Sequence, residues 1–359
     1  MRDDVIGVGL VGCGMIGQIH ADGLRKLVED GDIRAVAAAD PSEEARGAAN
    51  RNCPFARLHP DAAAVIDDPE VDAVMITAPT SAHRELVLAT VAAGKPLFCE
   101  KPLAPTFDVV RELVAAVAGI PAQVGFHSRF HPLHNHLRRL IGSGEVGAAM
   151  GYTLRDDQYW PTGDVVAGHS SWRSRRADAG GGALLEHSIH SVDILTWLFG
   201  PPVRVSAVSR RVFGYDVEDV AALVIEHRSG VVGTLLTIFN GVRGREERRL
   251  ETFFENAAVE VTTNFLVGAP EDSFLIQVAD QPAERLDLAA LRNRQFRALG
   301  ITRDDVVFYT YVEDRAWVQA IRAGRPPSPG FRDALIAHAV VDAAYRAADL
   351  GTPVAVEDG

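Results

Sequence analysis

Near its start the chain carries three glycines at fixed spacing, between an apolar segment and a helical pattern. The apolar residues from Val5 to Leu10 predict a buried strand, and Gly12, Gly14 and Gly17 follow it directly. From Gln18 to Val28 the apolar residues recur with the period of a helix. A strand, a G-x-G-x-x-G turn and a helix in this order form the dinucleotide-binding unit of a Rossmann fold. The sequence therefore predicts a doubly wound α/β domain at this end of the chain.

The turn itself predicts how a dinucleotide is held. Gly12 makes the tight turn, Gly14 lets the backbone approach a pyrophosphate, and Gly17 lets the helix pack on the strand. Met15 and Ile16 lie where the helix begins, and the free N–H groups of a helix N-terminus attract an anion. All five residues are therefore predicted to bind the cofactor.

A carboxylate at the end of the next strand indicates which dinucleotide binds. The segment from Ile33 to Ala39 predicts a strand, and Asp40 follows it. A carboxylate there can accept hydrogen bonds from both ribose hydroxyls and would repel a 2′-phosphate, which favours NAD over NADP. The alternative for Asp40 is a helix cap before Pro41. Arg46 is close enough in sequence to cover the adenine or meet a phosphate, so NADP stays an alternative.

The alternation of strands and helices continues to about residue 126 and brings further polar residues to strand ends. Val71 to Thr77 and Pro96 to Cys99 predict two more strands, and Lys101 closely follows the second. Ligands of open parallel sheets bind beyond the carboxyl ends of the strands, so Thr77 and Lys101 are candidate binding residues. A lysine at this place can donate a hydrogen bond to a substrate oxygen, whereas a surface lysine is the alternative.

The pattern changes at about residue 127, which predicts two domains, 1–126 and 127–359. A chain of 359 residues exceeds the size that one hydrophobic core usually serves. Valine-rich segments with period-two alternation recur between Val203 and Val278 and predict a large, mostly antiparallel open sheet. We expect helices on one face of this sheet and another subunit on the other. The predicted fold class is α/β, a Rossmann domain followed by an α/β domain.

A second glycine run precedes the residues expected to carry the chemistry. Gly180-Gly181-Gly182 predicts a loop that approaches a ligand or another backbone closely, and a helical pattern follows. Glu186 and His190 lie four apart, so on a helix they share one face. A carboxylate and an imidazole so placed are candidates for acid–base catalysis, with a solvated surface pair as the alternative. A zinc site that adds His187 is a further alternative.

Two neighbouring segments are harder to assign. Trp160 and Trp172 bracket a long polar loop, where an indole either faces a sugar ring or anchors the loop to the core. Histidines crowd residues 127–136, but no cysteine or carboxylate completes a familiar ligand spacing, so no metal is predicted. His134 and His136 are expected on the exposed side of the helix that follows.

The net charge, the apolar runs and the cysteines argue against several classes of protein. A net charge of -12 argues against a nucleic-acid partner, because a phosphate-binding surface usually leaves a basic excess. No apolar run approaches the length that spans a membrane, and the first residues do not look like a signal peptide. The three cysteines are scattered, as in proteins of a reducing compartment, so a cytoplasmic location is expected.

Taken together, five motifs resemble the glucose–fructose oxidoreductase/inositol dehydrogenase (Gfo/Idh/MocA) family. They are Gly12-x-Gly14-x-x-Gly17, Thr77-x-Pro79 with His83, Glu100-Lys101-Pro102, Trp172-Arg173, and the glycine run leading to His190. The resemblance covers nearly the whole chain and implies assembly as homodimers or homotetramers through the C-terminal sheet. Two positions depart from the family pattern: Glu186 stands where aspartate is usual, and Ser188 where glycine is usual.

The resemblance also implies roles for single residues. Lys101 and His190 would flank the reacting carbon, with Glu186 beside them, and the peptide bond before Pro102 would be cis. The other implied site residues are Pro79, His83 and Glu100 for the cofactor, and His127, Trp172 and Arg173 for the substrate.

The predicted function is hydride transfer between a nicotinamide cofactor and a secondary alcohol or ketone of a sugar, inositol or related polyol. One alternative is a redox-neutral, NAD-dependent glycosidase of the same family. Another is a cofactor-binding regulator without catalysis, although a sensor has no need of both Lys101 and His190.

Overall fold

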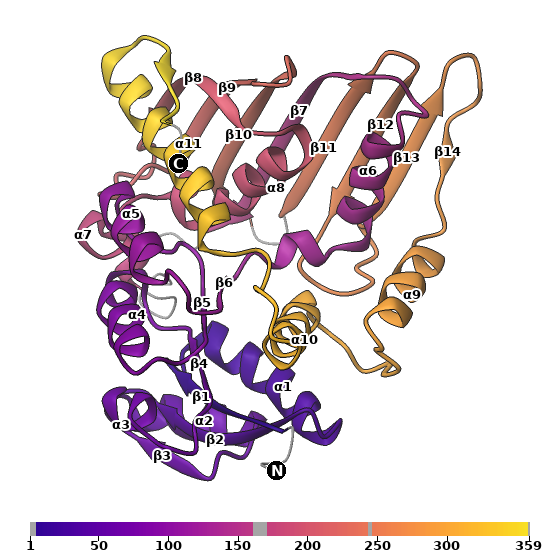
Figure 1. Cartoon of the computed structure of the whole chain (residues 1–359). Helices are drawn as coiled ribbons and strands as arrows, with labels where there is room; N and C mark the ends of the chain where they lie inside the picture. Colours follow the sequence, from indigo (N-terminus) through magenta and orange to yellow (C-terminus); the bar gives the residue numbers. More distant parts are fainter. Residues whose placement is uncertain (1–4, 161–170, 243–245, 358–359) are drawn as a thin grey trace. The chain divides into compact units, whose positions relative to one another are not determined.

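The computed structural model describes residues 5–160, 171–242 and 246–357 (Figure 1). The described chain divides into two compact units. The first unit contains the residues up to His127 together with Thr310–Leu335, and the second contains Ser128–Tyr309 and the residues from Ile336 onward.

A six-stranded parallel sheet forms the centre of the first unit, with strand order β3-β2-β1-β4-β5-β6. The strands are β1 (Ile6–Val11), β2 (Ile33–Ala39), β3 (Arg57–His59), β4 (Ala73–Ile76), β5 (Leu97–Cys99) and β6 (Ala122–Val124). The helices between them are α1 (Met15–Glu29), α2 (Glu43–Asn52), α3 (Ala63–Ile66), α4 (His83–Ala92) and α5 (Phe107–Ala116). The order reverses between β1 and β4, as in a Rossmann fold, so the predicted doubly wound domain is confirmed.

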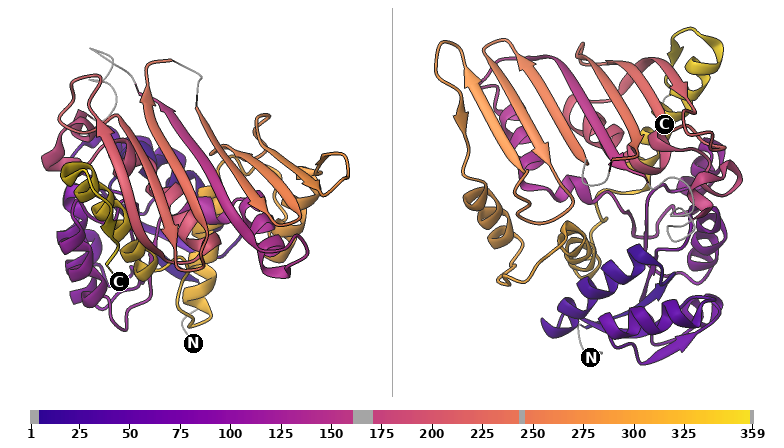
Figure 2. Two further views of the ribbon diagram at one scale, coloured as in Figure 1. Left: turned by 90° about the horizontal axis from the view of Figure 1, so that it is seen from above. Right: turned by 180° about the vertical axis from the view of Figure 1, so that it is seen from behind.

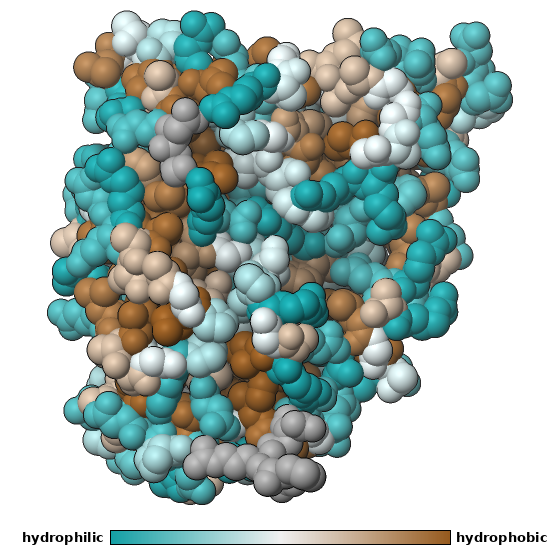
Figure 3. Space-filling model, in the orientation of Figure 1, coloured by the Kyte–Doolittle hydropathy of each residue, from teal (hydrophilic) through white to brown (hydrophobic). Residues whose placement is uncertain are grey.

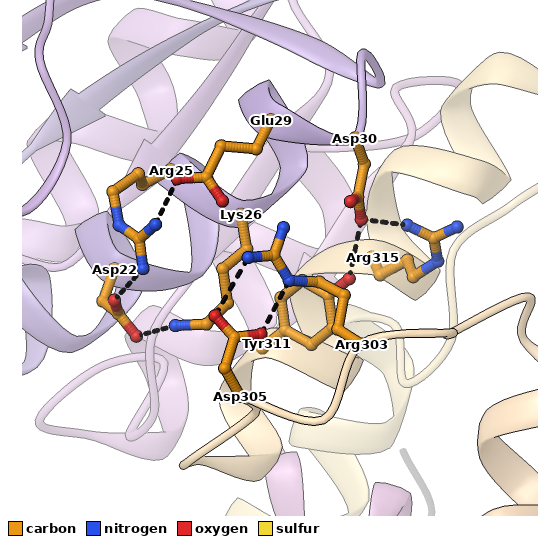
Figure 4. A network of polar contacts seen from close by, with 9 residues as sticks. All are labelled: Asp22, Arg25, Lys26, Glu29, Asp30, Arg303, Asp305, Tyr311 and Arg315. Carbon is orange, nitrogen blue, oxygen red and sulfur yellow. Dashed lines mark hydrogen bonds and ion pairs between the residues drawn. The ribbon is translucent and has the colours of Figure 1, made fainter.

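Helix α10 (Tyr309–Arg322) returns to this first unit from late in the sequence. Asp30 and Asp32, at the turn between α1 and β2, bind it. Tyr311 donates to Asp30 at 3.0 Å, and Arg315 donates to Asp32 at 2.8 Å (Figure 4 shows the part around Asp30). The predicted domain boundary at residue 127 assigned this helix to the second domain, 127–359. These contacts join residues more than 280 positions apart in the sequence, which no local pattern reveals.

A nine-stranded sheet forms the centre of the second unit, in the order β14-β13-β12-β11-β7-β10-β9-β8-β15. Every pairing is antiparallel except that of β7 with β10, so the predicted mostly antiparallel sheet is confirmed. The strands are β7 (Ala149–Tyr159), β8 (Pro202–Arg210), β9 (Val220–His227), β10 (Val232–Asn240), β11 (Glu247–Phe254), β12 (Ala257–Thr263), β13 (Ser273–Val278), β14 (Glu284–Arg285) and β15 (Val354–Ala355).

Helices cover one face of this second sheet. Figure 2 shows α6 (Pro132–Ser143), α8 (Ile189–Phe199) and α11 (Phe331–Leu350) on the same side of the strands. The opposite face carries no helix of the described ranges. Along β10, residues alternate between exposed and buried from Val232 to Leu235, as expected for a sheet with one solvated face. The short helices α7 (Arg176–Ala179) and α9 (Leu288–Ala298) complete the unit.

The exterior is mixed in character. Figure 3 shows hydrophilic residues interspersed with small hydrophobic patches on the face seen in Figure 1. No helix among the described residues is both long enough and apolar enough to cross a membrane.

Candidate active site

The glycine turn after β1 is fixed by close backbone contacts. Gly12 has a φ of 96°, and a Cβ there would lie 2.5 Å from the backbone nitrogen of Ala78. A Cβ on Gly17 would lie 2.2 Å from the carbonyl oxygen of Gly12. A Cβ on Gly14, in contrast, would meet nothing within 4 Å among the described atoms. The first and third glycines therefore serve packing, while the second leaves a space open above the backbone.

That space lies at the N-terminus of α1. Gly14 is the N-cap, no described side chain caps it, and the first turn carries no acidic residue. Met15 is 54% exposed. Uncapped N–H groups and the positive end of the helix dipole suit an anion, so this turn fits the pyrophosphate of a dinucleotide.

Asp40 braces the glycine turn from the end of β2. One carboxylate oxygen accepts from the N–H of Cys13 at 2.8 Å, and the other accepts from the N–H of Ser42 at 2.8 Å. Each oxygen keeps a second lone pair for a ribose hydroxyl. Ser42, not Asp40, caps α2, and Arg46 donates to the carbonyl oxygen of Asp40 at 2.6 Å. Arg46 therefore holds the main chain at the strand end.

Thr77 and His83 bind the loops around the turn. The Thr77 hydroxyl donates to the carbonyl oxygen of Gly12 at 2.6 Å. His83 is buried, and its ring nitrogens lie 2.8 Å from the carbonyl oxygen of Ala78 and 2.9 Å from that of Pro102. Burial lowers the pKa of His83. Both side chains therefore shape the loops, whereas the neighbouring Pro79 is exposed.

The Glu100-Lys101-Pro102 segment follows β5. The Glu100 carboxylate is buried; it accepts from the N–H of Lys101 at 3.0 Å and from His20 at 3.1 Å. The peptide bond between Lys101 and Pro102 is cis, as the resemblance implied. His20 and its second partner, Asp314, were not predicted as site residues.

In the second unit, the glycine run packs directly against the chain before β9. A Cβ on Gly182 would lie 1.9 Å from the carbonyl oxygen of Glu218. The Glu218 carboxylate accepts from the N–H groups of Gly182 at 2.9 Å and Leu184 at 3.0 Å, and from the Tyr345 hydroxyl at 2.9 Å. The predicted close approach of the glycines to another backbone is confirmed.

The predicted regular helix through Glu186 and His190 is wrong in detail. Residues Ala183–His187 form a π-helical turn, in which the N–H of Ser188 bonds the carbonyl oxygen of Ala183, and α8 begins only at Ile189. Glu218 binds the first N–H groups of this segment, so a side chain distant in sequence fixes where the turn starts. Such π-turns occur frequently at functional sites.

Glu186 and His190 are both buried, each 4% exposed, so the alternative of a solvated surface pair is excluded. Glu186 lies 3.5 Å from the guanidinium of Arg173, as an ion pair. That guanidinium lies over the ring of Trp172, with 5.3 Å to the ring centroid. The Trp172-Arg173 motif therefore contacts the segment that carries the acid–base candidates.

A buried carboxylate also binds this segment from the strand side. Asp156 of β7 accepts from His187 and Ser188, each at 2.9 Å, and from Ser191 at 2.5 Å. Burial alone would raise the pKa of Asp156, but Arg248, His187 and Ser191 hold this pKa well below its ordinary value. His187 thus binds Asp156. Within the described ranges, no three His, Cys, Asp or Glu side chains are placed to share a metal ion.

The tryptophans and histidines of the second unit differ in their surroundings. Trp160 is buried and stacks on Phe239 at 4.5 Å, which anchors that end of the loop, whereas Trp172 is half-buried. Residues 161–170 of the loop lie outside the described residues. His127 is half-buried in the 3₁₀ turn His127–Phe130.

The expectation of an exposed His134 is wrong. The side chain is buried and bonds the carbonyl oxygen of Ser128 at 2.8 Å. Burial lowers the pKa of His134 to about 3, so the ring is neutral.

A buried ion pair between Arg129 and Asp193, a residue of the helix that carries His190, was not predicted either. Arg129 binds both carboxylate oxygens of Asp193, at 2.8 and 2.6 Å. Asp193 lies one helical turn beyond His190, so its spacing from a candidate base was the available signal.

Comparison with known proteins fits both units. Residues 6–126 match the family described as "Oxidoreductase family, NAD-binding Rossmann fold", and residues 134–260 match the "GFO/IDH/MocA C-terminal domain". The inositol 2-dehydrogenase 2 of Saccharopolyspora erythraea is 33% identical over 249 residues, which cover 67% of this chain and 69% of that protein. The chain belongs to the Gfo/Idh/MocA family.

Two further relatives extend this likeness over the full length. The inositol 2-dehydrogenase of Acidothermus cellulolyticus is 30% identical over 99% of this chain and 96% of its own length. A levoglucosan dehydrogenase solved in complex with NADH has the same fold, with a TM-score of 0.85 at 24% identity, over 99% of this chain and 100% of that one. This member of the Gfo/Idh/MocA family is therefore an NAD-binding oxidoreductase.

Proposed function

We propose that the protein catalyses reversible oxidation of a secondary alcohol on an inositol, a sugar or a similar polyol. The names of its relatives, inositol 2-dehydrogenase and D-apiose dehydrogenase, support this class of substrate. The observation that carries the proposal is the buried Glu186–His190 segment, held by Glu218 and Asp156. Burial of an acid–base pair excludes water from it, which suits catalysis and is not needed in an inert surface pair.

In this proposal His190 accepts the proton of the reacting hydroxyl group. Lys101 donates a hydrogen bond to the same oxygen and stabilises the negative charge that develops there. Glu186, oriented by Arg173, holds a neighbouring hydroxyl group of the substrate. NAD, bound at the glycine turn, supplies the hydride acceptor.

A direct test combines cofactor titration with a substrate panel. The purified protein is titrated with NAD and with NADP, and each is then offered inositols, aldoses and sugar acids while the absorbance of reduced nicotinamide is followed. We expect tighter binding of NAD than NADP, because of Asp40, and turnover of at least one polyol. Tight cofactor binding with no absorbance change on any polyol would favour the redox-neutral glycosidase or the regulator instead.

Variants then assign the base. His190→Gln should lower kcat by about 10²–10⁴-fold, the usual contribution of general acid–base catalysis, with the Kd for NAD unchanged. His136→Gln is a matched control, because His136 is half-buried on α6 and its ring packs on Phe274. Normal turnover by His190→Gln would refute the assignment.

We further propose that the open face of the second sheet binds a second copy of the chain. The face exposes apolar side chains on four of its strands, each at least 36% exposed: Val208 on β8, Val224 on β9, Val232 and Leu236 on β10, and Phe253 on β11. An apolar patch of this kind on a sheet commonly marks a subunit interface. Sedimentation of Leu236→Glu, compared with Leu350→Glu at the exposed end of α11, tests this. The first substitution alone should shift the protein toward monomer.

A further inference from the structure

One buried histidine in the first unit links three elements of the fold. His20 lies on α1, three residues after Gly17, and is 0% exposed. Its Nδ1 lies 2.8 Å from Asp314 on α10, and its Nε2 lies 3.1 Å from Glu100, which follows β5. The rings of His20 and Phe98 pack edge to face, with 5.2 Å between their centroids.

Proton counting sets the charge of this cluster. An ionised carboxylate only accepts hydrogen bonds, and a neutral imidazole carries a single N–H. With a carboxylate against each ring nitrogen, both contacts are made when the imidazole is protonated on both nitrogens. Burial alone would lower the pKa of His20, but Asp314 and Glu100 raise this pKa well above its ordinary value. Burial also raises the pKa of Asp314, and the attraction to His20 opposes this shift. The two contacts together favour the protonated, cationic form of His20.

Both carboxylates fill spaces that only glycine leaves open. A Cβ on Gly125 would lie 2.6 Å from a Glu100 carboxylate oxygen, and a Cβ on Gly23 would lie 2.7 Å from an Asp314 carboxylate oxygen. Neither carboxylate can be displaced toward these backbones. The positions of the charges are thus set by close packing as well as by attraction.

The Glu100 carboxylate connects His20 to Lys101, the candidate catalytic lysine. Its Oε1 contacts His20, while its Oε2 accepts from the backbone N–H of Lys101 at 3.0 Å. We propose that His20 is a positioning residue for Lys101. From α1, the helix that follows the glycine turn, His20 holds the Glu100 carboxylate, and Glu100 in turn holds the backbone N–H of Lys101. This role deepens the proposed function and rests on it, because it assumes that Lys101 acts on the substrate.

Without the cation, the buried Glu100 carboxylate loses one of its described partners, so it is no longer held toward the Lys101 N–H. Even a small displacement of a catalytic group lowers turnover steeply, while the cofactor still binds elsewhere on the protein. We expect His20→Gln to lower kcat on the polyol by about 10- to 100-fold, with the Kd for NAD unchanged within about twofold.

Lys26→Gln is the matched control. Lys26 is a second buried cation on α1, 2% exposed and paired with Asp22 (Figure 4), and it has no contact with Glu100 among those described. It should leave kcat within about twofold of the wild type. An equal loss in both variants would mean that the effect is general destabilisation of α1, which overturns the proposal.

Two further measurements do not depend on turnover. Hydrogen exchange of residues 97–103 should quicken by about tenfold in His20→Gln and stay unchanged in Lys26→Gln. Nitrogen NMR should show both ring nitrogens of His20 protonated at about pH 8, above the ordinary histidine pKa of about 6.5. The signal is assigned among the 12 histidines by its loss in His20→Gln.

These experiments distinguish a failure of the proposed function from a failure of the positioning role of His20. If the wild type turns over no polyol, the proposed function fails, and the exchange result still decides whether His20 orders the Lys101 segment. Unchanged exchange in a folded His20→Gln protein, or a neutral His20 ring, overturns the positioning role. If His20→Gln does not fold, Asp314→Asn and Gly125→Ala perturb the same cluster and should quicken exchange at the same segment.

Discussion

The glycine turn of the first unit and the glycine run of the second bring backbone against backbone in similar ways, but they end in different helix N-termini. A Cβ on Gly17 would lie 2.2 Å from a carbonyl oxygen, and one on Gly182 would lie 1.9 Å from another. In the first unit the N–H groups after the glycines stay open to a ligand. In the second, the Glu218 carboxylate occupies those of Gly182 and Leu184. One helix start is therefore open to a ligand, and the other is anchored by Glu218 just before Glu186 and His190.

Two buried charge clusters, one in each unit, have central residues of opposite charge. In the first unit the cation His20 lies between two carboxylates. In the second unit the carboxylate of Asp156 lies among donors from His187, Ser188, Ser191 and Arg248. Both clusters orient a segment that carries a candidate catalytic residue, so opposite charge arrangements serve the same purpose.

The largest effect should come from removing the anchor of the second unit. Glu218→Ala leaves two backbone N–H groups and the Tyr345 hydroxyl without their buried acceptor. Hydrogen bonds to a charged group contribute most, so we expect a loss of about 4 kcal/mol in the free energy of unfolding. Urea unfolding measures this loss. Glu226→Ala on β9, where Glu226 pairs with Arg204 at the surface, should cost below about 0.5 kcal/mol. Equal losses would show that Glu218 is no anchor.

Two glycine variants test whether the first and second roles of the glycine turn, packing and cofactor binding, can be separated in the first unit. Gly17→Ala forces a Cβ against the carbonyl oxygen of Gly12, so we expect a loss of about 2–3 kcal/mol in unfolding free energy and weaker NAD binding. Gly14→Ala meets no neighbour, so the unfolding free energy should change by less than about 0.5 kcal/mol. It should still raise the Kd for NAD, because the methyl group fills the space predicted for the pyrophosphate. Calorimetric titration and thermal unfolding separate the two. Unchanged NAD binding in Gly14→Ala would place the cofactor elsewhere.

Opposite buried charges predict opposite pH dependence. The folded-state pKa of Asp156 is depressed, so its stabilisation is present above the unfolded value of about 3.9 and is lost as pH falls toward the folded pKa. The folded-state pKa of His20 is raised, so its stabilisation is present below about 6.5 and is lost as pH rises through the folded pKa. The cost of Asp156→Asn should therefore shrink in acid, and that of His20→Gln in base. Denaturant unfolding over a pH series tests both signs, and the same sign for both variants would contradict the comparison.

The smallest effect should come from one peripheral partner of the anchor. Tyr345→Phe removes a single hydroxyl donor from Glu218 and leaves both backbone donors in place. We expect a loss of about 1 kcal/mol in unfolding free energy. The kcat should stay within about twofold of the wild type, because the π-turn keeps its backbone contacts. A large fall in kcat would mean that the hydroxyl does more than support Glu218.

Local sequence patterns predicted much of the fold. The glycine spacing, the run of apolar strands and the period-two alternation all act over a few residues, and the structure confirms the Rossmann sheet and the mostly antiparallel sheet. Short or exposed elements gave too weak a pattern: β3, β14, β15 and α9 were not predicted. The acid–base candidates were found because their spacing is local, and their burial was beyond what spacing reveals.

The sequence by itself determined the glycine turn, the alternation of strands and helices that follows it, and the position of Glu186 and His190 beside a glycine run. Only the tertiary structure decided that His20 lies between Glu100 and Asp314, which are 80 and 294 residues away from it. It also decided that Glu218 sets the start of the π-turn, and that α10 joins the first unit. The physical reason is that periodicity records which face of an element is apolar. The partner of a buried charge depends instead on how the chain brings distant segments together.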